Sequence, residues 1–141
     1  MSQTTLAILK PDTVAAGNAG KVLAHLEAQG FTLRALRVVH LTQAQAEAFY
    51  EVHKERPFYG SLVTFMTEGP VIPVALERDN AVAYLREVMG ATDVAKAADG
   101  TVRKLFGTSI ERNAIHGSDS PENAARELGF FFAETERIAA R

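Results

Sequence analysis

A histidine and a helix start lie next to each other in one short segment of the sequence. His116 is followed by a Gly-Ser-Asp run and then by Ser120 and Pro121, which are typical of an N-cap and a first helical residue. Free N–H groups at a helix N-terminus favour anions, and histidine can act as a nucleophile near neutral pH. The segment therefore predicts a site where His116 receives an anionic group, although a plain helix cap beside a loop histidine has the same residues.

Lys10 is a second candidate, because it follows the apolar run Thr4–Leu9 and precedes Pro11. Proline restricts the residue before it to an extended conformation, so the Lys10 side chain should stand at the C-terminal end of a central strand. Ligands commonly bind at that end of the strands in open sheets. Lysines that end strands are also often simply solvated, so Lys10 alone is weak evidence for a site.

The composition is that of one soluble globular domain spanning residues 1–141, with 47% apolar and 23% charged residues. The net charge of −2 argues against a nucleic-acid binder that works by overall charge. The chain has no cysteine, so disulfides and thiolate metal sites are excluded. It also has no apolar run long enough for a bilayer and no signal-peptide pattern, so we expect a cytoplasmic protein with no membrane partner.

Apolar periodicity, caps and breakers divide the chain into strands and helices. A capping box at Thr42–Gln45 and a cap at Asp79 indicate helix starts, while Pro73 indicates an edge strand or a bulge. The expected helices begin near residues 22, 42, 79 and 120. The expected strands are 4–9, 31–41, 62–66 and 71–76, the last two joined as a hairpin through the turn 68–70.

This order predicts an α/β (α+β) fold, a ferredoxin-like sandwich in which helices cover one face of a four-stranded antiparallel sheet. A long irregular region, 91–120, would be inserted before the histidine. Loops of this length in compact domains are usually functional or disordered. Because this one contains Arg103, Asn113 and His116, we expect it to be functional.

Several segments together share their residues with one known family. They are Lys10–Asp12, His40–Leu41, His53–Phe58, Gly69–Val71, Arg86–Thr92, Gly100–Arg103, Asn113–Ser120 and Glu127–Phe132. The combination resembles the nucleoside diphosphate kinases over essentially the whole chain, whereas no single segment is specific. Two departures are Asp99, where the family usually has proline, and Tyr84-Leu85, where bacterial relatives commonly have Lys-Asn. Neither changes a residue that matches the family's site.

The resemblance implies a transferase that moves the γ-phosphoryl group of a nucleoside triphosphate, mainly ATP, to a nucleoside diphosphate. His116 would be the nucleophile in a ping-pong mechanism through phosphohistidine, with Glu127 orienting its ring and Ser118 supporting Glu127. Residues matching those that hold phosphates and the ribose are Lys10, Tyr50, Arg86, Thr92, Arg103 and Asn113. Phe58, Leu62 and Ile110 match the slot where the base stacks, and stacking on an aromatic ring gives broad base specificity.

The resemblance also implies Mg²⁺ as a cofactor, which keeps most of its water ligands and needs no dedicated cage of protein oxygens. Asp119 is the candidate for contacting the ion through water. Family members assemble into homo-oligomers, so we expect a dimer, tetramer or hexamer, and Glu134 and Glu136 could disfavour the larger assemblies. Nucleoside triphosphates and diphosphates are the expected substrates, with no specific nucleic acid as a partner.

The alternative from another class is a non-catalytic nucleotide- or nucleic-acid-binding module on the same sandwich, since a fold does not determine function. An RNA-binding version would need a strand motif that combines basic and aromatic residues on the open face of the sheet, and the expected strands 6–9 and 62–66 lack this motif. A relative that has lost catalysis is a third possibility. The presence of Lys10, Arg86, Arg103, Asn113, His116 and Glu127 argues against it.

Overall fold

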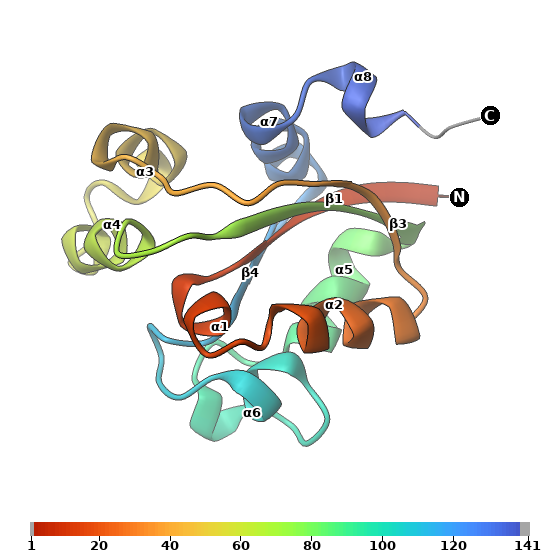
Figure 1. The fold of residues 1–141 in the computed structure, drawn as a ribbon, viewed down its shortest axis with the longest axis horizontal. Coiled ribbons are helices and arrows are strands. Elements are labelled where there is room, and N and C mark those ends of the chain that lie inside the picture. Colours follow the sequence, from red (N-terminus) through yellow and green to blue (C-terminus); the bar gives the residue numbers. More distant parts are fainter. Residues whose placement is uncertain (1, 139–141) are drawn as a thin grey trace.

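A four-stranded antiparallel sheet with the strand order β2-β3-β1-β4 lies at the centre of the computed structural model, which describes residues 2–138 (Figure 1). The strands are β1 (Ser2–Leu9), β2 (Thr32–Leu36), β3 (Ile72–Asp79) and β4 (Ile115–Gly117). The helices are α1 (Pro11–Ala15), α2 (Ala19–Ala28), α3 (Gln43–Phe49), α4 (Tyr59–Met66), α5 (Ala81–Met89), α6 (Val102–Phe106), α7 (Pro121–Phe131) and α8 (Glu134–Arg137), with short 3-10 turns at Glu51–His53 and Val94–Lys96. The expected four-stranded antiparallel sandwich is therefore confirmed.

Helices cover both faces of the sheet, so the expectation of one covered face is wrong. Along β1, Ala7 and Leu9 belong to a core that includes residues of α2 and α5. Leu6 and Ile8 belong to the opposite core, with residues of α3, α4 and α7, and the two groups of helices lie on opposite sides of the sheet in Figure 1. An uninterrupted apolar run such as 6–9 is typical of a strand that is buried on both faces.

The segment 62–66, expected to be a strand, lies in helix α4, and the hairpin expected between 62–66 and 71–76 does not form. A short apolar run has no periodicity that separates a strand from a buried helix turn. The fourth strand of the sheet is instead β4, which lies within the region 91–120 that was expected to be irregular. The sheet thus has the expected number of strands, but its fourth strand is 115–117 and not 62–66.

Two local predictions around β3 are also wrong. Asp79 is the last residue of β3 and not a helix cap; the N-cap of α5 is Asn80, and the side chain of Gln3 accepts the N–H of Val82 in the first turn. Pro73 lies in a central strand, not an edge strand, where it pairs with Ile8. On the other side of β3, β2 ends at Leu36, and just beyond it the Arg37 N–H donates to the Pro73 carbonyl oxygen at 3.2 Å, whereas the proline has no N–H to donate in return.

Two local capping signals, at Thr42 and at Ser120, were predicted correctly. Thr42 and Gln45 form the expected capping box at the start of α3, and the Ser120 side chain accepts the N–H of Asn123 at the start of α7. Gly90 ends α5 with φ +88°, a conformation that favours glycine. Within residues 2–138, no helix has the length and apolar character needed to cross a membrane.

Candidate active site

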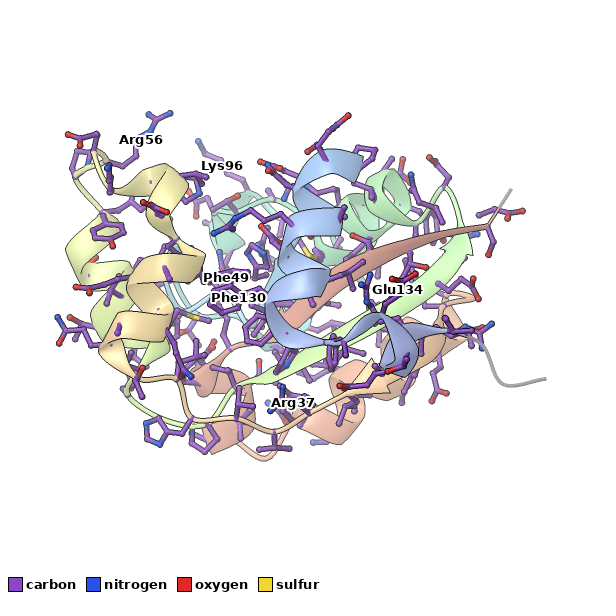
Figure 2. The ribbon with its side chains drawn as sticks, turned by 90° about the horizontal axis from the view of Figure 1, so that it is seen from above. Arg37, Phe49, Arg56, Lys96, Phe130 and Glu134 are labelled. Atoms are coloured by element: carbon purple, nitrogen blue, oxygen red, sulfur yellow. The ribbon has the colours of Figure 1, made fainter. Side chains whose placement is uncertain are left out.

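His116 lies in the middle of strand β4 and not in a loop. It pairs with Ile8 of β1, which places its side chain on the side of the sheet that α3 and α7 cover. The imidazole meets the rings of Phe49 and Tyr50 edge-on, with centroid distances of 5.5 and 6.0 Å. Figure 2 shows Phe49 close to Phe130 beside α7, and these two rings are 5.2 Å apart. The histidine, whose side chain is 19% exposed, thus has a fixed aromatic support.

Gly117 allows helix α5 to approach the strand that carries His116. A Cβ atom at this position would stand 2.6 Å from Sδ of Met89 and 3.0 Å from Cδ2 of Leu85, and both of these residues are fully buried. The same approach brings the guanidinium of Arg86, also on α5, to 3.4 Å from the Gly117 carbonyl oxygen. The glycine after the histidine therefore has a packing role, which places a cation next to β4.

Glu127 of α7 fixes the orientation of the His116 ring. Its Oε1 accepts hydrogen bonds from Nε2 of His116 at 2.8 Å and from Oγ of Ser118 at 2.7 Å. Burial alone would raise the pKa of Glu127, but these two hydrogen bonds and the nearby histidine hold the pKa below its usual range. Since an ionised carboxylate can only accept, Nε2 is the donor of this bond, and in the neutral imidazole Nδ1 is then the nitrogen with the lone pair.

Lys10 is a buried cation, with only 7% of its surface exposed. Its ammonium group donates to Oδ1 of Asn113 at 2.9 Å, and the Asn113 amide donates to the carbonyl oxygens of Ile110 and Thr92. Burial and the neighbouring Arg103 together lower the pKa of Lys10 to about 8, although Asp12 and Glu111 oppose the shift. A lysine in this environment is readily available to an anionic ligand, because the protein offsets only part of its charge.

Arg103 is the second buried cation and is 5% exposed. Its two terminal nitrogens donate to the carbonyl oxygens of Gly90 and Ile115 at 3.0 and 2.9 Å. Burial and the neighbouring Arg86 lower its pKa to about 10. Among the described residues no carboxylate forms an ion pair with Lys10, Arg86 or Arg103, so three cations lie near β4 without a bound counter-charge.

Tyr50 places a phenol beside the imidazole. Its hydroxyl is buried and has no hydrogen-bond partner among residues 2–138. Burial and the charge of Glu127 raise its pKa far above neutrality, so the hydroxyl stays protonated and can act as a donor. A buried hydroxyl without a partner is costly unless a ligand satisfies it.

Exposed apolar side chains lie on two segments that a hydrogen bond joins. Phe58, 47% exposed, immediately precedes α4, and Ile110, 61% exposed, lies in the loop before β4. The hydroxyl of Ser61 in α4 donates to the Glu111 carboxylate of that loop at 2.7 Å. Leu62 is half-buried on the same helix, and Phe58 contacts His53 with a centroid distance of 5.5 Å. These apolar groups could pack against a flat ring.

Two residues of the predicted site lie at its exposed rim. Thr92 has an exposed side chain, and its carbonyl oxygen binds Asn113. Asp119 is exposed, accepts a hydrogen bond from Asn123 and shares a shallow hollow with Arg86 and Pro121. No group of three or more His, Asp and Glu side chains in the described part of the chain is arranged to hold a metal ion.

Three residues in or next to the site were not singled out from the sequence. Phe49 supports the imidazole, Phe65 lies 5.9 Å from the Lys10 ammonium, and Asp12 accepts the N–H of Ala114 at 3.1 Å. Phe49 and Phe65 are indistinguishable from core residues in the sequence, because both are buried. The sequence did point to Asp12 as a site residue, because it directly follows the Lys10-Pro11 pair.

Comparison with known proteins gives a consistent result. Residues 3–137 match the family described as nucleoside diphosphate kinase. A nucleoside diphosphate kinase of Sorangium cellulosum is 53% identical over 134 residues, which are 95% of this chain and 93% of the relative. One of Anaeromyxobacter sp. is 54% identical over 134 residues, 95% of this chain and 92% of the relative.

Solved structures give the same result at the level of the fold. The nucleoside diphosphate kinase of Aquifex aeolicus superposes with a TM-score of 0.95 at 42% identity, covering 98% of this chain and 100% of that one. A halophilic nucleoside diphosphate kinase from Halobacterium salinarum, solved in complex with CDP, superposes with a TM-score of 0.94 at 33% identity, covering 100% and 94%.

Proposed function

The chain belongs to the nucleoside diphosphate kinase family, and on that premise we propose that His116 carries the phosphoryl group between two nucleotides. The enzyme is a phosphotransferase that acts on nucleotides. The observation that carries the assignment of His116 is its hydrogen bond to Glu127. That bond occupies Nε2, so Nδ1 has a free lone pair for attack on phosphorus.

The transfer takes two steps at one site. In the first, Nδ1 of His116 attacks the γ-phosphorus of a triphosphate, a P–N bond forms, and the bond from the γ-phosphorus to the bridging oxygen breaks to release the diphosphate. In the second, a terminal oxygen of the acceptor diphosphate attacks the phosphohistidine, and the P–N bond breaks. Because donor and acceptor use the same residues in turn, the kinetics are ping-pong.

The cations near β4 stabilise the charge on the transferred group. Arg86 and Arg103 present planar guanidinium groups that suit phosphate oxygens, and Lys10 adds a compact charge from the end of β1. Tyr50, Thr92 and Asn113 offer polar groups to the phosphates and the ribose. Since phosphoryl transfer depends mainly on positioning and charge stabilisation, these residues account for most of the chemistry that the protein must supply.

Mg²⁺ fits this donor set as an ion held mainly by phosphates and water, because the described residues offer single exposed carboxylates and not a cage. Asp119 would contact the ion through water, and the ion would neutralise phosphate charge. Phe58, Leu62 and Ile110 would hold the base by stacking and apolar contact, which predicts broad base specificity. We further propose a homo-oligomer, a dimer, tetramer or hexamer, that works in the cytoplasm.

Intact-protein mass spectrometry tests the proposal directly. The protein should gain one phosphoryl group with ATP and Mg²⁺ at mildly alkaline pH and lose it on addition of GDP. His116→Ala should show no gain, whereas His25→Ala, which changes a half-buried histidine of α2, should behave as the unchanged protein does. Nucleotide binding without any mass gain would instead support a binding module.

A further inference from the structure

Ala114 has an unusual backbone conformation two residues before His116. Its φ is +76°, in the left-handed region, and it is fully buried. Residues with a Cβ atom avoid this region, and Ala lacks the side-chain hydrogen bonds that help Asn and Asp to occupy it. Strain of this kind persists only where the surroundings hold it, and it is concentrated at functional sites.

The segment Lys10–Thr13 forms hydrogen bonds to both the N–H and the carbonyl oxygen of Ala114. The Ala114 N–H donates to Oδ2 of Asp12 at 3.1 Å. Its carbonyl oxygen accepts from the Lys10 N–H and from Oγ1 of Thr13, both at 2.9 Å. Of these three bonds, only the one to Asp12 involves a carboxylate, and hydrogen bonds to charged groups are the stronger ones.

The residues on either side of Ala114 are those that the proposed reaction uses. Asn113 accepts from the Lys10 ammonium, and the Ile115 carbonyl oxygen accepts from Arg103. A change in the backbone torsions at Ala114 would move Asn113 and His116 relative to each other. The position of Asn113, which accepts from the Lys10 ammonium, relative to the His116 ring therefore depends on the torsions of Ala114.

We propose that Asp12 is a positioning residue of the transfer reaction, which acts by holding Ala114 in its left-handed conformation and so sets His116 against Lys10 and Asn113. The inference rests on the proposed role of His116. It assigns to Asp12 no contact with the nucleotide.

The charge of Asp12 gives the proposal a second consequence. The charged groups that face Lys10 are Asp12 in α1, Glu111 in the loop before β4 and Arg103 in α6, while the Arg112–Glu68 ion pair lies beside the Phe65 ring that Lys10 also faces. Asp12 and Glu111 raise the pKa of Lys10, and Arg103 lowers it. Without the Asp12 charge, Lys10 should lose its proton at a lower pH.

Single-turnover phosphorylation by saturating ATP and Mg²⁺ tests the positioning role. Asp12→Ala should slow phosphohistidine formation about tenfold to hundredfold, the range expected when a charged hydrogen bond is lost. Adding Ala114→Gly to Asp12→Ala should restore most of the rate, because glycine adopts a positive φ without a carboxylate to hold it. Ala114→Gly alone should stay close to the unchanged protein.

Asp12→Asn separates the hydrogen bond from the charge. Its amide oxygen can still accept the Ala114 N–H, so we expect a smaller loss of rate at neutral pH, together with a shift of the alkaline limb of the pH–rate profile to lower pH. This variant keeps the proposal testable if Asp12→Ala does not fold. Asp99→Asn, which removes a carboxylate from an exposed turn, is the matched control and should change neither the rate nor the profile.

The proposal is overturned if folded Asp12→Ala phosphorylates at the unchanged rate, or if Ala114→Gly fails to restore the rate of folded Asp12→Ala. It is also overturned if Asp12→Asn leaves the pH–rate profile unchanged. Each of these results requires that the unchanged protein form phosphohistidine. A protein that never does so contradicts the proposed function itself, so the two failures are distinguishable.

Discussion

Oε1 of Glu127 lies 2.8 Å from Nε2 of His116, which ties the second turn of α7 to strand β4. Ser118 donates to the same oxygen, so the carboxylate is held from two directions. The hydrogen bond determines which imidazole nitrogen is protonated and in which direction the other one points. The nucleophile of the proposed reaction is thus prepared before any nucleotide binds.

Glu127→Gln tests this preparation. The amide is similar in shape but uncharged, so its hydrogen bond to His116 is weaker and no longer selects one tautomer. We expect phosphohistidine formation to slow about tenfold or more, as measured by single-turnover mass spectrometry. Glu122→Gln, an exposed change in the first turn of α7, is the control. Equal rates for Glu127→Gln and the unchanged protein would contradict the proposed role of Glu127.

Arg103→Lys should cost both activity and stability. The guanidinium binds the carbonyl oxygens of Gly90 and Ile115 together, and one ammonium group cannot reproduce both bonds in the same geometry. We expect the free energy of unfolding in urea to fall by about 1–2 kcal/mol and the turnover number to fall with it. Arg34→Lys, at the half-buried ion pair with Glu77, should retain full turnover. Full turnover of Arg103→Lys would exclude a role for the guanidinium in the reaction.

The helix starts at Thr42 and Ser120 could be predicted from the sequence because their capping signals are local, whereas the cap expected at Asp79 is one residue off. The Thr42–Gln45 box and the Ser120-Pro121 start depend on residues that are three or four positions apart. Strand β4 could not be predicted in the same way, because three residues form it only through their pairing with β1 at the other end of the chain. The short apolar run of α4 is equally ambiguous, since its burial against α3 determines its conformation.

The functional site shows the same contrast between features that the local sequence indicates and features that depend on distant segments. The residue types at His116, Lys10 and Glu127 indicate chemistry in the sequence itself, and the resemblance gave each a role. The hydrogen bond from Ala114 to Asp12 depends on a positive φ and on two segments about a hundred residues apart, and no local pattern predicts either. The support of His116 by Phe49 was missed for the same reason, because a core phenylalanine gives no sign of its neighbour.

Phe58→Ala should weaken nucleotide binding with little effect on folding. The ring is half-exposed, so the protein loses little packing, whereas stacking of a base on an aromatic ring contributes about 1–3 kcal/mol. We expect KM for several nucleotides to rise about tenfold by a similar factor for each base, with kcat almost unchanged. Leu105→Ala, at another exposed apolar position, is the control. A KM that stays constant would place the base elsewhere.

Gly117→Ala should destabilise the protein, because its new methyl group would meet the buried side chains of Met89 and Leu85. Overpacking of a core costs about 1–3 kcal/mol, which urea unfolding can measure. Gly20→Ala should instead stabilise the protein slightly. Nothing lies within 4 Å of a Cβ atom at this position, and alanine favours the α2 helix in which the residue lies. A Gly117→Ala protein as stable as the unchanged one would mean that α5 can move away from β4 at little cost.

The lowered pKa of Lys10 makes the free energy of unfolding depend on pH in the alkaline range. Its pKa of about 8 in the folded protein is below its usual value of 10.5, so between these values the unfolded chain binds more protons than the folded one. Stability therefore rises with pH across that window, by at most about 1.4 kcal/mol per pH unit, while below pH 8 the full cost of burying the charge remains.

Lys10→Met lacks this contribution. We expect the unchanged protein to gain free energy of unfolding relative to Lys10→Met between about pH 7.5 and about pH 9.5, measured in urea, because the window opens near the lowered pKa. Lys21→Met, at an exposed lysine of α2, should follow the unchanged protein at both values. Parallel pH dependence of Lys10→Met and the unchanged protein would show that the lysine keeps its ordinary pKa despite its burial, and that its proton is not what limits activity at alkaline pH.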